Sequence, residues 1–303
     1  MSAATAHAVL DAAREAARRG DLDQGATLAG EAHRAFRSNA DHAGRMRAAA
    51  LLGRLAFERG RLPEAELRFT EALRLARRHG DQAMMARATL NLGSLAHQRG
   101  DDKAALRHYS DALTLYDQLG DETGRAQSYH QLGRVLRQMG RLLAAGEAVR
   151  HALAHAAHGG DRALEGRVLV GAAELALAEQ RPHEAAHLLE RAEPLLCDDA
   201  DSLGRVEARR VAALLALWRG EAQEAYALAL EAQASAGLRG GAFLEAECTA
   251  VCALALRAAG RGAEAERFCA AAIEHFTLLG ATGARRRFLR EWEGEETDGA
   301  PGT

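Results

Sequence analysis

The feature that most constrains this chain is a glycine that recurs at a fixed step of 20 residues. The series is Gly20, Gly60, Gly80, Gly100, Gly120, Gly140, Gly160, Gly220, Gly240, Gly260 and Gly280, with Ala40, Gln180 and Ala200 at the other multiples of 20 up to 280. Each glycine follows a run rich in Ala, Leu, Arg and Glu, with apolar residues at helical spacing. Such a glycine is typical of a helix C-terminus, because it enters the left-handed conformation at little steric cost. The pattern predicts a series of helices separated by tight turns.

The residues that follow these turns predict where the next helices begin. Aspartate comes directly after the turn at Asp21, Asp81, Asp101, Asp121 and Asp161. Its side chain can accept a hydrogen bond from a free N–H of the first helical turn. Pro63 and Pro182 also fall near predicted helix starts, where a missing N–H costs little. Pro194 lies inside a predicted helix, so we expect an early end or a kink there.

Alternate helices differ in sequence, so the true repeat is a helix pair of 40 residues. A small residue recurs in the first helix of each pair at Ala13, Gly53, Gly93, Gly133, Ala173, Ala213 and Ala253. The second helix has a larger residue at Phe69, Tyr109, Val149, Leu189 and Cys269, with Ala229 as the exception. Small residues let two helices approach to about 8–10 Å, and the larger residue fills the space between them. One pair alone cannot bury its apolar faces, so stacked pairs must form the core.

This spacing of small and large residues resembles the tetratricopeptide repeat (TPR). The resemblance rests on Leu92, Gly93, Ala105, Tyr109 and Ala112, and recurs at Leu52, Gly53, Ala65, Phe69 and Ala72 and at Leu132, Gly133, Ala145 and Ala152. The usual TPR has 34 residues. The 40-residue form, with longer helices, is similar to the variant in bacterial regulators and cell-polarity adaptors. The resemblance implies an all-α solenoid, a right-handed superhelix whose concave face binds peptides or partner helices.

The repeats account for nearly all of the chain. We expect about seven TPR-like antiparallel helix pairs within residues 5–280, near 5–40, 41–80, 81–120, 121–160, 161–200, 201–240 and 241–280. Residues 281–292 predict a capping helix, with Phe288 and Trp292 covering the end of the stack and the arginines pointing outward. Residues 293–303 are polar and glycine-rich and are expected to be disordered.

Composition narrows the class of protein. The net charge of −3 excludes a generally basic nucleic-acid binder. The sequence has no apolar stretch of about 18 residues, so we expect no membrane span. Charged residues interrupt the N-terminal segment, which is therefore not a secretory signal. Four cysteines without paired short spacing do not form a disulfide scaffold. We expect a cytoplasmic protein without a cofactor.

Fixed positions of each first helix line the concave face in this family, and they can be carried over onto this sequence. In repeats two to four they give a basic, amide-rich set: Arg47, Arg54, Arg87, Asn91, Gln127, His130, Arg134 and Arg137. In the later repeats they give apolar residues, among them Leu214 and Trp218. These ten residues are the predicted binding site for a peptide or partner.

The chemistry of this set suggests a ligand. Arginine binds carboxylates with two hydrogen bonds, and Asn or Gln can hold an extended peptide backbone. We expect a protein or peptide partner with an acidic segment or a C-terminal carboxylate, anchored by an apolar residue near Trp218. The alternative is a solvated inner face whose charges form intramolecular ion pairs.

One enzyme-like string stands out: His183-Glu184-Ala185-Ala186-His187 matches the HExxH pattern of zinc peptidases. Here it begins a second helix on the outer side of the solenoid, and no flanking strand is predicted. We therefore expect neither catalysis nor a metal site. Cys252 and Cys269 occupy core columns and are read as small hydrophobic residues.

Three functions compete. The leading one is a non-catalytic scaffold or adaptor with a regulatory or assembly role. The second is a peptide-sensing regulator whose superhelix changes shape on binding. The third, disfavoured, is a zinc hydrolase built on the HExxH string. The sequence leaves the oligomeric state open.

Overall fold

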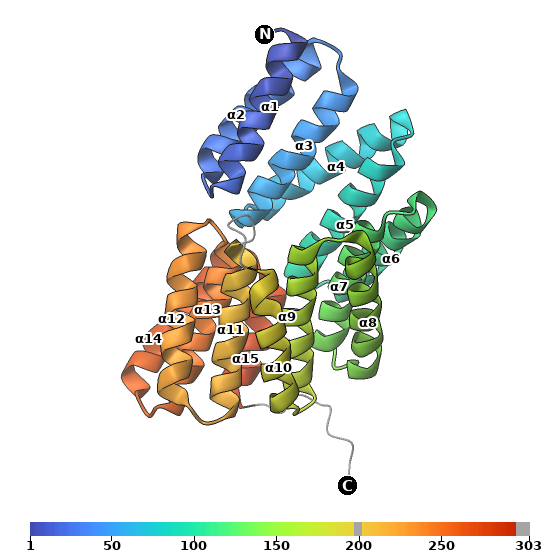
Figure 1. The fold of residues 1–303 in the computed structure, drawn as a ribbon. Coiled ribbons are helices and arrows are strands. Elements are labelled where there is room, and N and C mark those ends of the chain that lie inside the picture. The colour runs from blue at the N-terminus through green and yellow to red at the C-terminus, as the bar shows by residue number, and fades with distance from the viewer. Residues whose placement is uncertain (197–201, 295–303) are drawn as a thin grey trace.

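The chain folds almost entirely into helices that run antiparallel to their neighbours (Figure 1). The computed structural model describes residues 1–196 and 202–294, and within these ranges it has fifteen α-helices, one 3₁₀ helix and no strand. The helices are α1 (Ala3–Arg18), α2 (Leu22–Ser38), α3 (His42–Glu58), α4 (Leu62–His79), α5 (Gln82–Gln98), α6 (Asp102–Leu119), α7 (Glu122–Gln138), α8 (Leu142–Gly159), α9 (Arg162–Ala178), α10 (Pro182–Ala192), the 3₁₀ helix η1 (Glu193–Leu195), α11 (Ser202–Trp218), α12 (Ala222–Leu238), α13 (Ala242–Ala258), α14 (Gly262–Leu278) and α15 (Thr282–Glu293). The expected all-α solenoid is confirmed.

The turns lie where the 20-residue step predicts them. Every glycine of the series has a positive φ, between 64° and 83°. Ala40 (φ 54°) and Gln180 (φ 59°) take the same left-handed conformation without being glycine. Position 200 lies outside the described residues. Each of the five predicted aspartate caps accepts a hydrogen bond from the backbone N–H three residues later, and so does Asp41.

The two helices of a pair meet through the predicted small and large residues. A Cβ added to Gly93 would lie 2.6 Å from the ring of Tyr109, and one added to Gly53 would lie 2.5 Å from Phe69. Both aromatic side chains are buried. At Gly133 the contact is looser, since a Cβ there would lie 3.3 Å from Val149. The packing inferred from the two columns is therefore confirmed at these pairs.

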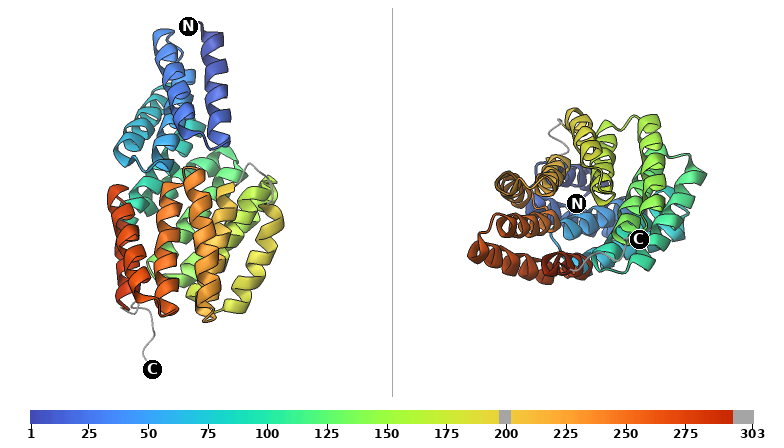
Figure 2. Two further views of the ribbon diagram at one scale, coloured as in Figure 1. Left: turned by 90° about the vertical axis from the view of Figure 1, so that its left-hand side faces the viewer. Right: turned by 90° about the horizontal axis from the view of Figure 1, so that it is seen from below.

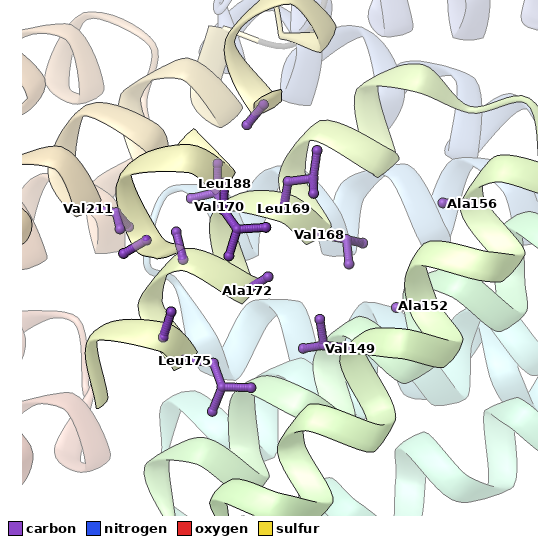
Figure 3. Close-up of a cluster of buried hydrophobic side chains, with 14 of the residues drawn as sticks. Val149, Ala152, Ala156, Val168, Leu169, Val170, Ala172, Leu175, Leu188 and Val211 are labelled. Carbon is purple, nitrogen blue, oxygen red and sulfur yellow. The ribbon is translucent and has the colours of Figure 1, made fainter. Parts of the chain in front are cut away.

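A continuous apolar core joins repeats four to six. Figure 3 shows Val149 on α8 and Val168 and Leu175 on α9 gathered between neighbouring helices. Helix α10 ends at Ala192, ahead of Pro194, and gives way to η1. Leu196 follows η1 and is fully buried in the same core. The early helix end expected at the proline is thus present, and the shortened helix still contributes to the core.

The coil closes on itself, along a contact between its beginning and its end that we call the seam. The seam is defined by Phe57, Gly100, Phe243, Thr282 and Gly283. The rings of Phe57 and Phe243 lie 5.2 Å apart, and Thr282 Oγ1 donates a hydrogen bond to a carbonyl in the turn after α5. A Cβ on Gly283 would lie 2.8 Å from Cα of Gly100, so the two backbones are in direct contact. The left view of Figure 2 shows the orange and red C-terminal helices below the blue N-terminal ones.

Apolar side chains from both sides of the seam form one cluster. Phe69 and Leu95 contribute from the early repeats, and Phe243, Phe276 and Phe288 contribute from the late ones. All five are buried. The first helices of the middle repeats therefore form the inner wall of a closed coil.

Helix α15 occupies the segment for which the sequence predicts a cap. Phe288 is buried, and Trp292 packs against the seam cluster with the guanidinium of Arg257 4.6 Å from its ring centroid. Arg285 and Arg286 are exposed as expected, but Arg287 is half-buried and points inward. Helix α15 runs to Glu293, so the tail predicted from residue 293 begins within it; residues 295–303 lie outside the described residues.

In the ranges that the structure describes, no helix is both long enough and apolar enough to cross a membrane.

Candidate functional site

A pocket of about 250 Å³ lies on the inner wall of the coil. Side chains from α5, α7, α9 and α11, the first helices of four successive pairs, form it. They are Leu90, Asn91, Ser94, Gln127, His130, Gln131, Arg134, Leu164, Arg167 and Glu207. The 40-residue repeat explains this convergence, because equivalent positions of successive first helices face the same interior.

Polar groups dominate the lining. Asn91, Gln127 and Gln131 each offer an amide, which can donate and accept hydrogen bonds. His130 is buried, and its Nδ1 has no hydrogen-bond partner in the described chain. Burial, aided by the charge of Arg134, lowers the pKa of His130 to about 3, so the ring is neutral at physiological pH. The pocket thus combines neutral donors and acceptors with one arginine-rich side.

A network of buried ion pairs borders the pocket. Glu174 of α9 accepts from Arg137 of α7 at 2.7 Å and also from Arg210 of α11. Arg210 Nε lies 3.5 Å from Glu247 of α13. Burial would raise the pKa of the Glu174 carboxyl, but the neighbouring arginines outweigh it and hold that pKa well below its usual range. Glu174 is therefore ionised and ties three helices together.

The pair on the pocket wall itself is looser. Arg134 lies 3.9 Å from Glu207, at the limit of an ion pair, and its Nε is buried without a hydrogen-bond partner in the described residues. Burial raises the pKa of Glu207 despite the nearby arginines. Arg134 is thus less fully paired than Arg137 or Arg210.

Comparison with known proteins agrees with the repeat analysis. Residues 84–156 and 124–198 match the model of the tetratricopeptide repeat. Residues 84–198 are therefore tetratricopeptide repeats. No curated protein matches its sequence.

Solved structures share the TPR fold over most of this chain. A Rap protein complexed with competence and sporulation factor is 13% identical, covers 97% of this chain and 98% of that one, and gives a TM-score of 0.60. The Rap conjugation gene regulator of the plasmid pLS20, in complex with the Phr* peptide, is 16% identical, with coverages of 96% and 76% and a TM-score of 0.73. Aspartyl phosphate phosphatase F from Bacillus subtilis is 14% identical, with coverages of 79% and 61% and a TM-score of 0.65. At these identities the likeness concerns the fold alone.

Some of the predicted site residues meet in the TPR interior. Asn91, Gln127, His130 and Arg134 all line the pocket. Arg137 lies in the adjoining ion-pair network, with Glu174 as its partner. The alternative reading, that inner charges pair within the molecule, holds for this part of the wall, although the pairs are buried rather than solvated.

The other predicted residues lie elsewhere. Arg47 is exposed and turns back to the carbonyl of Ala43, and Arg54 pairs at 3.8 Å with Glu58 on its own helix. Arg87 is exposed and interacts with Tyr116. None of these arginines lines the pocket.

The predicted apolar anchor is divided between two environments. Leu214 packs into a cluster of α11, α12 and α13, so the fold already uses it. Trp218 ends α11 with 52% of its surface exposed. Neither residue lines the pocket.

Four further pocket residues lie in the same repeat columns as predicted site residues. They are Gln131, Ser94, Arg167 and Glu207, and the repeat places them on the same inner face. Leu90 and Leu164 look like ordinary core residues, and no sequence signal distinguishes them.

The enzyme-like string lies on the outside. His183 and His187 are exposed at the start of α10, and Glu184 pairs with Arg181. The described part of the chain contains no group of three or more potential metal ligands. Cys248, Cys252 and Cys269 are buried, and burial raises the pKa of each thiol.

Proposed function

We propose that this TPR protein is a non-catalytic, cytoplasmic scaffold that binds a short peptide or partner segment in the pocket between α5, α7, α9 and α11. The observation that carries the proposal is the convergence of three amide side chains from two successive first helices, Asn91, Gln127 and Gln131, on one cavity. An extended peptide presents alternating N–H and C=O groups, and amides can satisfy both.

The lining also suggests which chemical groups of a peptide would contact each part of the pocket. Leu90 and Leu164 offer apolar contact, whereas Arg134 offers a guanidinium that is only loosely paired with Glu207. A carboxylate forms two charge-assisted hydrogen bonds with arginine. An acidic side chain or a C-terminal carboxylate near Arg134 therefore fits the chemistry of the pocket.

The pocket's hydroxyl supports a binding role rather than catalysis. Ser94 Oγ donates to the carbonyl of Leu90 at 3.4 Å and accepts from the hydroxyl of Tyr109 at 3.3 Å. Burial raises the pKa of Tyr109 to about 12, which keeps it a donor. A nucleophilic serine needs a base that takes its proton, and neither of these partners is one.

Peptide capture tests the proposal. The full chain is immobilised and incubated with a library of random short peptides, and retained sequences are identified by mass spectrometry. Their affinities are then measured by calorimetry for the wild type and for Asn91→Ala combined with Gln127→Ala. We expect a loss of about tenfold or more from the missing hydrogen bonds.

Gln118→Ala is the matched control, because Gln118 is an exposed amide at the end of α6. It should leave affinity unchanged. Retained peptides whose affinity is insensitive to the double substitution would place binding elsewhere and refute the pocket.

A second candidate, a peptide-sensing regulator, is favoured by the seam. Its contacts join residues more than 180 positions apart, for example Thr282 and the turn after α5. Two of the similar structures are Rap proteins in complex with a factor or peptide. Small-angle scattering with and without a captured peptide separates the two functions: a sensor changes its radius of gyration, and a plain scaffold does not.

A further inference from the structure

The second helices of the first two pairs carry a basic surface that the fold does not neutralise. It consists of five exposed arginines, which we call the arginine face: Arg34 and Arg37 on α2 and Arg74, Arg77 and Arg78 on α4. Within residues 1–196 and 202–294 none of their guanidiniums makes an ion pair or a hydrogen bond. These five charges are therefore available to a partner.

One contact places the arginines of the two helices next to each other. His33 of α2 and Glu71 of α4 share a hydrogen bond, with 3.1 Å between Nε2 and Oε1. Both helices are the second of their pair, so they run in the same direction. Arg37 follows His33 by one helical turn, and Arg74 follows Glu71 by one turn. Residues three or four apart lie on the same side of a helix, so Arg37 and Arg74 are neighbours across the two helices.

The carboxylates of this region are too few to balance its arginines. Residues 29–50 and 68–81 contain eight arginines and four carboxylates. Glu71 is bound by side chains of α2, α3 and α4. Asp41 and Asp81 each accept a hydrogen bond from a backbone N–H at the start of a helix, at 2.8 Å and 2.9 Å. Arginines therefore outnumber carboxylates two to one here, and most of the carboxylates already have partners.

Acidic side chains mark the borders of the arginine face. On the next second helix, α6, Asp117 occupies the repeat position of Arg77, and it pairs with Arg125 at 2.7 Å. Asp111 on α6 is exposed, and so is Glu31, one turn before the first arginine of α2. The basic surface is thus two helices wide and about two helical turns long.

We propose that the arginine face binds a short acidic helix of a partner protein. This goes beyond the proposed function, because first helices form the pocket and second helices form the arginine face. A guanidinium forms two charge-assisted hydrogen bonds with a carboxylate. Residues three or four apart on a helix have Cβ atoms about 5–6 Å apart. The arginines of α4 have this spacing, and glutamates on one side of a partner helix would match it in distance as well as in charge.

Two features favour a protein over other polyanions. The acidic borders at Glu31 and Asp111 suit a short segment, whereas a DNA duplex carries one charge at about every 1.7 Å of its axis and would extend over them. Leu67, two turns before Arg74 on the same side of α4, has 63% of its surface exposed. An amphipathic acidic helix can place an apolar residue against Leu67. One leucine is too little apolar surface to hold the protein on a membrane.

A designed peptide is the probe for the first test. It is alanine-based, about 16 residues long so that it can form a helix, and it has glutamates three and four positions apart and one central leucine. Binding to the full chain is measured by fluorescence anisotropy. We expect the affinity to fall about tenfold between 50 and 200 mM sodium chloride, because salt screens exposed charges. A second peptide, in which proline replaces two central alanines, cannot form the helix and should bind at least about fivefold more weakly. Equal binding of the two peptides would overturn the proposed helix.

Matched variants locate the site. Arg37→Gln combined with Arg74→Gln should weaken peptide binding about fivefold, as for the loss of two exposed ion pairs. Arg107→Gln combined with Arg150→Gln removes the same charge from exposed positions on α6 and α8 and should leave the affinity unchanged. Melting curves check that both variants fold. A peptide that does not bind the wild type, or that loses the same affinity in both variants, overturns the arginine face.

Other polyanions complete the test. A short DNA duplex and phosphatidylserine vesicles are measured against the full chain at the same salt concentration, and the acidic peptide should bind more tightly than either. Tighter binding of the duplex or the vesicles that depends on Arg37 and Arg74 would assign the face to phosphate and overturn the acidic partner. Because the pocket lies on other helices, failure of either proposal leaves the other standing.

Discussion

Arg54 and Arg134 occupy the same position of the repeat, two pairs apart, yet they meet different surroundings. Arg54 on α3 is half-exposed and pairs with Glu58 one turn along its own helix. Arg134 on α7 is mostly covered and faces Glu207, which lies on a helix two pairs further along the chain. The repeat fixes the face on which a residue lies. Closure of the coil decides whether that face is a surface or an interior.

The largest expected effect on stability comes from removing the charge of a buried carboxylate in the interior. Glu174→Gln leaves the guanidiniums of Arg137 and Arg210 without their anion, and we expect it to lower the free energy of unfolding by about 3–5 kcal/mol. The measurement is urea denaturation followed by circular dichroism. Glu58→Gln, which breaks the 3.8 Å pair with the half-exposed Arg54, should cost less than about 1 kcal/mol. Similar costs at the two sites would break the comparison.

The contact inside a helix pair offers the next test. Gly93→Leu forces a side chain into the ring of Tyr109, which already lies 2.6 Å from a Cβ there. We expect a loss of about 1–3 kcal/mol or more from overpacking, measured as a lower melting temperature. Gly133→Ala is the contrasting change at the same repeat position. Val149 leaves it more room, and alanine favours helix over glycine by about 1 kcal/mol, so it should be nearly neutral or stabilising.

Protonation of the interior gives a smaller, pH-dependent effect. Burial lowers the pKa of His130 from the ordinary value of about 6.5 to about 3 in the folded state, so the unfolded chain takes up this proton first as the pH falls. The contribution of His130 is complete above pH 6.5 and is lost as the pH falls below that value. It should change by about 1 kcal/mol per pH unit between pH 6 and 5.

His130→Gln tests this by removing that slope from the difference between wild-type and variant unfolding free energies. His183→Gln, a change at an exposed histidine of α10, is the control and should leave the slope as it is. A slope that persists in His130→Gln would assign the pH dependence to other groups.

The smallest expected effects lie at the turns. Ala40 and Gln180 adopt a left-handed backbone that costs a non-glycine residue about 1–2 kcal/mol. Ala40→Gly and Gln180→Gly should each raise the free energy of unfolding by about 0.5–1 kcal/mol, after the added freedom of the unfolded chain is subtracted. The melting temperature should rise slightly as a result. Gly80→Ala, where no atom lies within 4 Å of a new Cβ, should lower stability by a similar amount. The same sign for Ala40→Gly and Gly80→Ala would contradict the explanation.

Local chemistry made much of the fold predictable from the sequence. The left-handed turns, the aspartate caps and the fit of Gly93 to Tyr109 each depend on residues close together within one or two helices. These local features recur every 40 residues, so they can be predicted without knowing how the helix pairs stack in space.

The candidate site was less predictable because it depends on curvature. The repeat identified the inner face correctly for Asn91, Gln127 and Arg134. Small rotations between pairs accumulate into closure, and no single residue encodes them. The pairing of Arg137 with Glu174 and the inward turn of Arg287 both follow from closure. Arg47 and Arg54 lie on the predicted face in the second repeat, where later helices do not cover it, so both side chains are exposed.

The packing of α15 against the turn at Gly100 also limits the number of repeats that such a protein can gain or lose in evolution. An open array tolerates the gain or loss of a unit, since each unit touches only its neighbours. In this molecule an extra hairpin between α5 and α13 would carry Gly283 away from Gly100 and expose the aromatic cluster on both sides. The contact between Gly283 and Gly100 therefore sets the number of helix pairs in one complete turn of the superhelix.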